Sequence, residues 1–596
     1  MSHDSMERPV ETGVEQKGFI RIFMKTLLIA INAKYIHSNL AVYSLKASAG
    51  VWKDEVEIAE YTINHLREDI LADIYRRKPD VAAFSCYIWN MEYVQSLLKD
   101  LKKVLPDTEI WLGGPEVSYD CEEVLEREPN VRGIMTGEGE TTFRELQSWY
   151  HGEGKLSDIR GLVCRDEEGK LCHTGIREYE KLDDLPFVYE DMTKFQNRII
   201  YYESSRGCPF SCSYCLSSID KRVRFRSLPL VKRELAFFLE HRVPQVKFVD
   251  RTFNVNHART KELLRFLKEQ DNGVTNFHFE ISADLLDEEE IELLNSLRPG
   301  LVQLEIGVQS TDGAVLGAIH RTADFEIIAD KVRRIQKGRN VHQHLDLIAG
   351  LPYGTPEEFR SSFNDVYRLR PQQFQLGFLK VLKGSEMGQR AGEFGVVRTE
   401  RPPYEVLSTK WLSYGDVLKI KGIEEMVEVY YNSWQFARTV ELLTEEFEDF
   451  FGLYEALADF YEKQGYNGRS HSRMERLLIL REFALFVNRD RKASFEQALL
   501  MDLYAREKSK SRPAFAPDLS ARKNEIYEFY KKEAEVHRYL TGETYESMNA
   551  RQLLNQTHLE ILSGEKEEWY LFDYQKRDPL TGDARIVQVH DIVLRR

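Results

Sequence analysis

The sequence predicts an α/β protein in which two strand–helix regions are followed by a mainly helical region. Short apolar runs alternate with stretches of helical spacing over residues 25–150, and the alternation returns over 198–395. From residue 396 the spacing is helical and rich in aromatic residues. At 596 residues the chain is too long for one hydrophobic core. We expect three domains, with a linker or small β-hairpin crossing over 151–197 and a disordered leader over 1–24.

The first region contains five strand–helix units. Its strands are expected at 26–31, 56–61, 81–85, 109–112 and 133–135. Its helices are expected at 40–48, 68–77, 91–105, 122–128 and 141–150. This order predicts a doubly wound, Rossmann-like parallel sheet of five strands. Ligands of such sheets bind at the carboxyl ends of the strands. The loops expected at those ends are 32–39, 87–90, 113–118 and 137–140.

The second region predicts six strand–helix units and therefore an open, partial (β/α)6 TIM-like barrel, with its chemistry at the carboxyl ends of the strands. The strands are expected at 199–203, 245–249, 276–281, 301–307, 344–348 and 373–381, with helices such as 230–241 and 257–270. The third region predicts helices at 417–466, 474–486 and 494–508, and a terminal hairpin formed by 568–574 and 584–589.

The composition narrows the class of protein. Hydrophobic residues make up 42% and charged residues 30% of the chain, which is ordinary for a globular protein. The formal net charge of −15 disfavours a protein that wraps nucleic acid, because phosphate binding needs clustered Lys and Arg. No apolar run approaches the roughly 20 residues that span a bilayer, and no secretory signal precedes the first region. We expect a cytoplasmic protein without a membrane segment.

Three cysteines follow the first strand of the second region. Cys208, Cys212 and Cys215 have the spacing C-x3-C-x2-C, and all seven cysteines of the chain lie before residue 216. Three thiolates on one tight loop can each bind a different iron of a cubane cluster, which leaves the fourth iron open to a small chelating ligand. The alternative is zinc, which usually takes four ligands, so a histidine would have to complete the site.

The segment 201–218 resembles the signature of the radical S-adenosylmethionine (SAM) superfamily. The resemblance implies a [4Fe–4S] cluster on the three cysteines and a SAM that chelates the open iron. It also implies SAM contacts at the later strand ends, by Asp250, Glu280, Gln309, Ser310, Arg321 and Gly350. The chain departs from the usual pattern at two positions, where His320 replaces an asparagine and Tyr353 replaces a glycine.

The first region lacks both G-x-G-x-x-G and the P-loop motif. Instead, a Gly-Gly loop follows the fourth strand, where paired glycines let the backbone approach a bulky ligand. The region resembles the cobalamin-binding domain of cobalamin-dependent radical SAM enzymes. The resemblance implies cobalamin contacts by Asn32, His37, Ser38, Asn39, Tyr87, Trp89, Gly113, Gly114, Glu116, Ser118, Gly137, Glu138 and Gly139.

Two of these assignments have structural alternatives, because His37 can be a solvated loop residue and Trp89 can pack against a helix. The chain lacks the D-x-H-x-x-G motif, so no histidine is expected as the lower axial ligand of cobalamin.

The resemblance as a whole implies a cobalamin-dependent radical SAM methyltransferase. Such an enzyme methylates an unactivated carbon through reductive SAM cleavage and methylcobalamin, and it needs an external flavodoxin- or ferredoxin-like electron donor. The expected substrate is a small molecule or peptide. The alternatives are a non-methylating cobalamin enzyme that rearranges, cyclises or reduces its substrate, a tRNA-modifying enzyme and a non-catalytic cobalamin sensor. The third region matches an uncharacterised helical extension, and we assign no catalytic residue.

Overall fold

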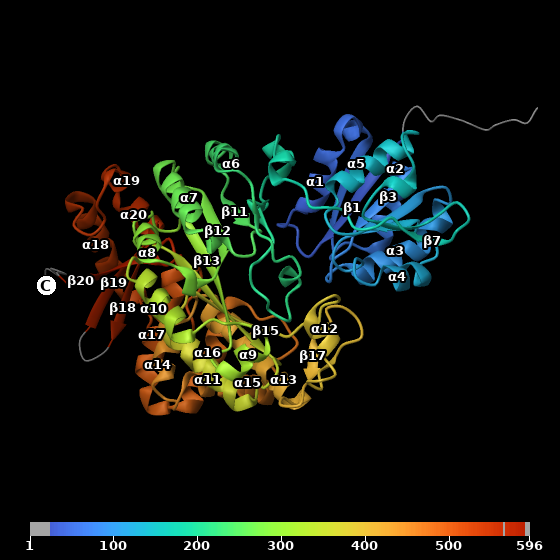
Figure 1. The fold of residues 1–596 in the computed structure, drawn as a ribbon. Helices are drawn as coiled ribbons and strands as arrows, with labels where there is room; N and C mark the ends of the chain where they lie inside the picture. Colours follow the sequence, from blue (N-terminus) through green and yellow to red (C-terminus); the bar gives the residue numbers. More distant parts are fainter. Residues whose placement is uncertain (1–23, 564–566, 591–596) are drawn as a thin grey trace, which may run out of the picture. The chain divides into compact units, whose positions relative to one another are not determined.

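The computed structural model describes residues 24–563 and 567–590, so the expected leader, apart from Met24, lies outside the described residues. The chain divides into two compact units between Arg198 and Ile199, and each contains one large sheet (Figure 1). Among the residues described, no helix combines the length and the apolar character needed to cross a membrane.

The large sheet of the first unit has the strand order β2-β1-β3-β4-β5-β6-β7. Its parallel strands are β1 (Thr26–Asn32), β2 (Val56–Thr62), β3 (Val81–Ser85), β4 (Glu109–Gly113) and β5 (Gly133–Met135). The predicted positions of all five strands are confirmed. The expectation that the sheet has five strands is wrong, because β6 (Leu162–Arg165) and β7 (Leu171–His173) add as an antiparallel hairpin. This hairpin, which lies within the expected linker, covers the otherwise exposed edge of β5.

Helices cover both faces of this sheet, which confirms the doubly wound fold. They are α1 (Leu40–Ser48), α2 (Arg67–Arg77), α3 (Met91–Val104), α4 (Cys121–Arg127) and α5 (Glu140–Tyr150). On one face, side chains of α2, α3 and α4 pack in a core that contains Ile29 and Phe84. On the other face, side chains of α1 and α5 pack in a core that contains Leu28 and Trp111. Alternate residues of β1 thus enter opposite cores, as expected for a strand buried on both sides.

The large sheet of the second unit has six parallel strands in the order β15-β14-β13-β12-β11-β8. They are β8 (Ile200–Tyr202), β11 (Gln245–Phe248), β12 (Asn276–Ile281), β13 (Val302–Gln309), β14 (His342–Ala349) and β15 (Gln373–Phe378). Between them lie α6 (Leu228–Glu240), α7 (His257–Glu269), α8 (Glu288–Asn295), α10 (Phe325–Gln336) and α11 (Pro356–Arg368). The strands β8 and β15 stand at opposite edges, so the sheet is the predicted open, partial barrel.

The helical region that follows is fixed to this sheet. It includes α13 (Tyr414–Val427), α14 (Ala437–Thr444), α15 (Phe450–Gln464), α16 (Arg473–Val487) and α17 (Lys492–Arg506). The side-chain amide of Asn432 exchanges two hydrogen bonds with the backbone of Phe374 in β15, at 2.8 and 2.9 Å. Arg360 of α11 also pairs with Asp449, at 2.8 Å. The amide of Asn432 thus occupies the edge of β15 where another strand could pair. The expected domain boundary near residue 396 stays a prediction.

The expected hairpin of 568–574 and 584–589 is confirmed, and an additional strand extends it to a three-stranded sheet. Its strands are β18 (Thr557–Ser563), β19 (Glu567–Arg577) and β20 (Ala584–Val589), in that order. The additional strand β18 carries a buried charge, Glu560, that breaks its apolar pattern, so the alternation that predicts a strand is weakened. Arg512 neutralises this charge, with two hydrogen bonds of 2.7 and 2.8 Å.

Candidate active site

A tight loop in the second unit carries the three clustered cysteines. β9 (Ser205–Arg206) and β10 (Arg224–Phe225) pair antiparallel at its base. Gly207 has a φ of 92°, and a Cβ at this position would lie 2.2 Å from the carbonyl oxygen of Arg222. Glycine is therefore required where the loop begins, because any side chain would force the two segments apart.

The three thiols share one small region. Cys208 and Cys212 are buried, Cys215 is half-buried, and all three are free. A guanidinium nitrogen of Arg321 lies 3.9 Å from Cys212 Sγ, and Thr252 Oγ1 lies 3.6 Å from Cys208 Sγ. Burial raises the pKa of the Cys212 thiol, while the charge of Arg321 opposes the rise. The guanidinium therefore favours the thiolate that a metal needs.

The cysteine loop is also held from the segment after β15. The backbone N–H of Met387, in α12 (Glu386–Arg390), donates to the carbonyl of Ser213 at 2.8 Å. Tyr214 packs against an apolar cluster that includes Phe394 and Val406. Residues far along the chain thus fix the backbone between Cys212 and Cys215.

Asp250 follows β11 and is buried. Its carboxylate accepts hydrogen bonds from the backbone N–H and hydroxyl of Ser204, at 2.7 and 2.6 Å, and from the hydroxyl of Ser205, at 2.7 Å. Burial raises its pKa, and these hydrogen bonds act in the opposite direction. Asp250 therefore fixes the chain entering the cysteine loop. The SAM contact that the resemblance implies for it stays a prediction.

At the end of β13, Gln309 and Arg321 meet over Gly307. Gln309 has a φ of 72°, and its Nε2 would lie 2.2 Å from a Cβ on Gly307. Arg321 donates to the carbonyl oxygen of Gly307. Ser310 donates to Glu358 at 2.7 Å. The structure thus brings Gln309 and Arg321 together beside Cys212 and engages Ser310 with α11.

Both residues that depart from the family pattern, His320 before β14 and Tyr353 after it, have a left-handed backbone. Tyr353 has a φ of 65° and His320 a φ of 57°, in the left-handed region that suits glycine and asparagine. Tyr353 is half-exposed, and its ring centroid lies 4.6 Å from that of Trp411. Gly350 has a φ of 85°, and a Cβ there would lie 2.7 Å from Val406 Cγ1. This glycine is therefore needed to accommodate a residue of the C-terminal region.

In the first unit, the predicted residues of the loop after β1 are brought together around Glu60. Asn32 Nδ2 donates to Glu60 Oε1 at 3.0 Å and to the carbonyl oxygen of His37 at 3.1 Å. The backbone N–H of Asn39 donates to Glu60 Oε1 at 3.0 Å, and its side chain caps α1. Ser38 is buried beside them. These contacts fix the loop conformation, and cobalamin contacts by its residues stay predictions.

The loop after β3 presents a pair of stacked aromatic rings. The rings of Tyr87 and Trp89 lie 4.4 Å apart with an interplanar angle of 9°. Trp89 is 43% exposed, and its Nε1 donates to the carbonyl oxygen of Ile31 at 3.1 Å. Asn90 is buried and donates to the same oxygen at 3.0 Å. The partly exposed stack stands at the carboxyl ends of β1 and β3, where such sheets bind ligands.

The glycine loops after β4 and β5 serve the fold in part. Gly114 has a φ of 110°, and a Cβ there would lie 2.4 Å from the carbonyl oxygen of Cys86. Gly114 is therefore needed for this close backbone approach, and its predicted contact with cobalamin stays a prediction. Ser118 donates to the carbonyl of Gly114 at 2.7 Å. The other residues of these loops that are predicted to contact cobalamin are Gly113, Glu116, Gly137, Glu138 and Gly139. Glu116 is buried, a Cβ on Gly137 would meet no atom within 4 Å, and Gly139 stands at the start of α5.

Comparison with known proteins separates three regions. Residues 26–147 match the family described as "B12 binding domain", and residues 202–366 match the "Radical SAM superfamily". Residues 392–578 match a "Protein of unknown function (DUF4080)". This chain contains a B12-binding domain and a radical SAM domain.

Individual relatives agree with this assignment. The cobalamin-dependent radical SAM methyltransferase TokK of Streptomyces tokunonensis is 27% identical over 315 residues, which are 48% of this chain and 45% of TokK. The anaerobic magnesium-protoporphyrin IX monomethyl ester cyclase of Rubrivivax gelatinosus is 23% identical, with 58% of this chain and 64% of the cyclase covered. The chain thus spans less than two thirds of each. The solved structure of the cobalamin-dependent SAM radical enzyme OxsB shares the fold, with a TM-score of 0.56, 15% identity and coverage of 81% of this chain and 84% of OxsB.

The family assignment implies three cofactors: a [4Fe–4S] cluster, SAM and cobalamin. The cysteine loop fits the cluster, since it supplies three free thiols beside one guanidinium. Among the described residues, one set of three potential metal ligands has its ligand atoms within 4.8 Å of one another. It consists of His257, Asp287 and Glu290. The three thiols of the cysteine loop do not form such a group among the described residues.

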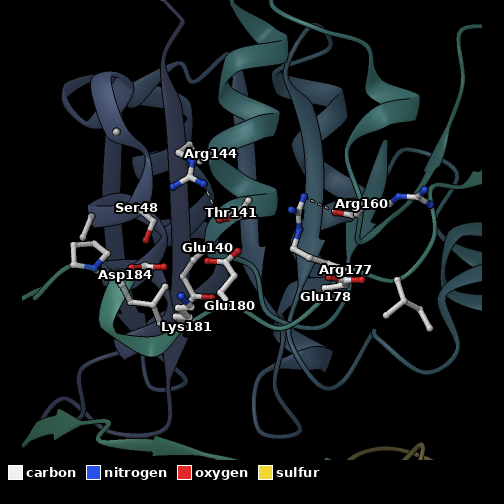
Figure 2. A pocket seen from close by; sticks show the side chains of 15 residues that line it. Ser48, Glu140, Thr141, Arg144, Arg160, Arg177, Glu178, Glu180, Lys181 and Asp184 are labelled. Carbon is white, nitrogen blue, oxygen red and sulfur yellow. Dashed lines mark hydrogen bonds between the residues drawn. The ribbon is translucent and has the colours of Figure 1, made fainter. Parts of the chain in front are cut away.

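A shallow cavity of about 1010 Å³ lies elsewhere in the B12-binding unit (Figure 2). Arginine and lysine side chains face a similar number of carboxylates across it, and Arg144 donates to Thr141 Oγ1 at 2.9 Å. Its labelled charged residues are Glu140, Arg144, Arg160, Arg177, Glu178, Glu180, Lys181 and Asp184. None of the residues expected to contact cobalamin lines it. The balanced charges and this separation give no support for cobalamin binding there.

The large sheet of the second unit has a polar face that the sequence motifs did not identify. Lys247 Nζ and His278 Nε2 lie 3.0 and 2.9 Å from Glu305 Oε2. On β14, His344 Nε2 lies 2.9 Å from Asp346 Oδ1. The alternation of polar and apolar residues within the predicted strands is the sequence signal that could have identified this face.

Replacing Gly207 with alanine tests the geometry of the cysteine loop. The added Cβ meets the Arg222 carbonyl in a backbone conformation that costs a non-glycine residue about 1–3 kcal/mol. We expect the purified variant to hold much less iron and sulfide than the unaltered protein. Gly313→Ala is the control, because no atom lies within 4 Å of its new Cβ. Equal iron in both variants would contradict the assignment.

Proposed function

We propose that this protein is a cobalamin-dependent radical SAM methyltransferase acting on an unactivated carbon of a small-molecule or peptide substrate. The observation that carries the proposal is the presence, in one chain, of a B12-binding fold and a three-thiol loop clamped beside Arg321. Relatives named as methyltransferases, including TokK, support it.

The chain's own residues hold and orient the reactants. Cys208, Cys212 and Cys215 would bind the cluster, and Gln309 with Arg321 would hold SAM beside it. The half-exposed stack of Tyr87 and Trp89 would support the corrin. When bound, the cluster and SAM supply a carbon-centred radical, and cobalamin supplies a methyl group. A flavodoxin- or ferredoxin-like protein would provide the electron.

A second candidate is a cobalamin enzyme that does not methylate. The similarity to the Rubrivivax gelatinosus cyclase, over more of this chain than the TokK match covers, favours it. Both candidates use the same cysteine loop and B12-binding fold, so the products distinguish them.

The decisive experiment is anaerobic purification with iron, sulfide and cobalamin supplied, followed by incubation with SAM and a reductant. The methyltransferase proposal predicts bound iron and corrin, and formation of both 5′-deoxyadenosine and S-adenosylhomocysteine. Deoxyadenosine with no S-adenosylhomocysteine, in the presence of bound corrin, would favour the second candidate. Absence of both products would contradict the two proposals.

A further inference from the structure

The side chains on the polar face of the radical SAM sheet lie in rows that run across the strands. The paired register places Lys247, His278, Gln303 and His342 in one row across four strands. The next row contains Glu280, Glu305, His344 and Gln373. The row nearest the strand ends contains Gly307, Asp346 and Gln375. Basic side chains thus dominate the first row, and carboxylates enter the two rows above it.

The opposite face of the same strands is apolar. Phe248, Phe279 and Leu345 are buried there, and Tyr202 packs against Phe238 of α6 with 5.7 Å between ring centroids. The polar face is partly open to solvent by contrast, since the side chains of Glu305 and Asp346 are 23% and 18% exposed. A ligand can therefore reach the polar rows.

Most charges on this face have partners within it. Lys247 and His278 both contact Glu305, and burial is outweighed by these contacts, so the pKa of Glu305 falls to about 2. Among the described residues, Asp346 has only His344 as its ion-pair partner. Glu305 thus balances positive charge of the first row. The rows above the first row still contain hydrogen-bond acceptors.

Two acceptors lack partners. The side chain of Glu280 forms no hydrogen bond or ion pair with the residues that the structure describes, and burial, followed by the charge of Glu305, raises its pKa to about 7. Gln309 Oε1 is buried without a hydrogen-bond partner, and the amide of this 9% exposed residue lies over Gly307 on the polar face. Buried polar atoms are nearly always hydrogen-bonded, so Gln309 Oε1 calls for a ligand with a donor. The half-buried carboxylate of Glu280 can accept from a ligand as well.

Glu280 lies deeper on the polar face than Gln309, which we expect to hold SAM. In the β12–β13 register Glu280 pairs with Glu305, four residues before Gln309. At about 3.3 Å per residue, Glu305 is roughly 13 Å along β13 from Gln309. A metal ion is disfavoured, because Lys247 already occupies Glu305. The carboxylate of Glu280 is therefore available to a third molecule.

We propose that the polar face binds the substrate through a protonated amino group, which Glu280 and Asp346 accept. This assigns Glu280 to the substrate in place of the SAM contact implied by the resemblance. It rests on the proposed function, because only a reacting molecule needs to be held within the radical SAM sheet. The substrate class is then an amine, including an amino acid or a peptide side chain, rather than a purely apolar molecule.

The test uses the full-length reconstituted protein with saturating SAM and three probes of similar length: 1,4-diaminobutane, butane-1,4-diol and succinate. Calorimetry should detect the diamine in preference to the others. Glu280→Gln and Asp346→Asn should each weaken diamine binding by about tenfold or more, the worth of a hydrogen bond to a charged group. Glu288→Gln, an exposed glutamate on α8, should leave it unchanged. Because Glu280 and Asp346 lie on different strands, the second variant still tests the proposal if the first one misfolds.

Diamine affinity should also rise from pH 6 to pH 8, because Glu280 loses its proton over that range and a cation favours its ionised form. Glu305, Asp346, Lys247 and Arg251 also act on Glu280. This rise should disappear in Glu280→Gln.

Preferential binding of succinate or the diol, or displacement of the diamine by SAM, would overturn the amine assignment. SAM cleavage by the same preparation separates the two proposals. Cleavage without diamine binding refutes the substrate class alone, whereas diamine binding without cleavage refutes the proposed function and leaves an amine-binding site.

Discussion

Replacing Cys212 with alanine is expected to lower 5′-deoxyadenosine formation by at least about 100-fold, because loss of a residue that merely supports a metal ligand costs 10–100-fold. Cys212 is buried, lies 3.9 Å from Arg321 and is one of only three thiols on its loop. Removing it leaves two thiolates for a cluster that needs three. The measurement is deoxyadenosine released per protein, with iron and sulfide quantified on the same sample.

The matched control is Cys172→Ala, which removes a free cysteine from the hairpin of the B12-binding unit. It should retain the iron content and SAM cleavage of the unaltered protein. If Cys212→Ala and Cys172→Ala release equal deoxyadenosine, the three-cysteine loop does not hold the catalytic cluster.

Both large sheets could be predicted because their strands carry local signals. Residues 81–85 form a short apolar run, and β3 spans Val81–Ser85. The hairpin of β6 and β7 has only four and three residues per strand, too few for a clear period. Strand β18 was missed for another reason, since Glu560 is buried through a pair with Arg512, 48 residues away. A partner that distant leaves no local trace.

The residues of the candidate active site show the same difference between local sequence signals and contacts from distant segments. The spacing of Cys208, Cys212 and Cys215 predicts one loop, and the structure places them on one. Nothing in the sequence connects that loop to Met387, although its N–H holds the carbonyl of Ser213. Nor does the sequence show that Asp250 is fully engaged by Ser204 and Ser205. Such contacts arise from packing between distant segments, which periodicity does not encode.

A glycine with a left-handed backbone does not by itself indicate a ligand. Gly114 has the left-handed backbone that suggests a binding loop, yet its missing Cβ is required by the carbonyl of Cys86. Conversely, Tyr353 adopts a left-handed φ at a position where the family has glycine. A left-handed residue costs free energy, and at functional sites the surroundings hold such strain in place. The contact between Tyr353 and Trp411 does this by bringing a residue of the DUF4080-matched region onto the segment that is predicted to bind SAM.

The C-terminal region should depend strongly on its buried ion pair. Glu560 is fully buried, and Arg512 binds both of its oxygens. Arg512→Met would leave the carboxylate with only the neighbouring His558, so we expect the free energy of unfolding of this region to fall by about 3 kcal/mol at neutral pH. Urea titration followed by hydrogen exchange of the β18 and β19 amides measures the loss locally.

An exposed pair of the same type provides the control for that variant. Arg522 binds both oxygens of Glu567 on β19, but the side chain of Glu567 is 43% exposed. Arg522→Met should therefore cost no more than about 1 kcal/mol.

The pH dependence of stability provides a second test of the role of Arg512. Burial opposes ionisation of Glu560, but Arg512 and His558 hold its pKa below the ordinary value. A depressed folded pKa stabilises the protein above the unfolded pKa, and this contribution is lost as pH falls through the folded value. The difference between Arg512→Met and the unaltered protein should thus be largest at neutral pH and shrink in acid, where protonated Glu560 no longer needs a cation. A difference that grows in acid would show that Arg512 stabilises the region by packing rather than by its charge.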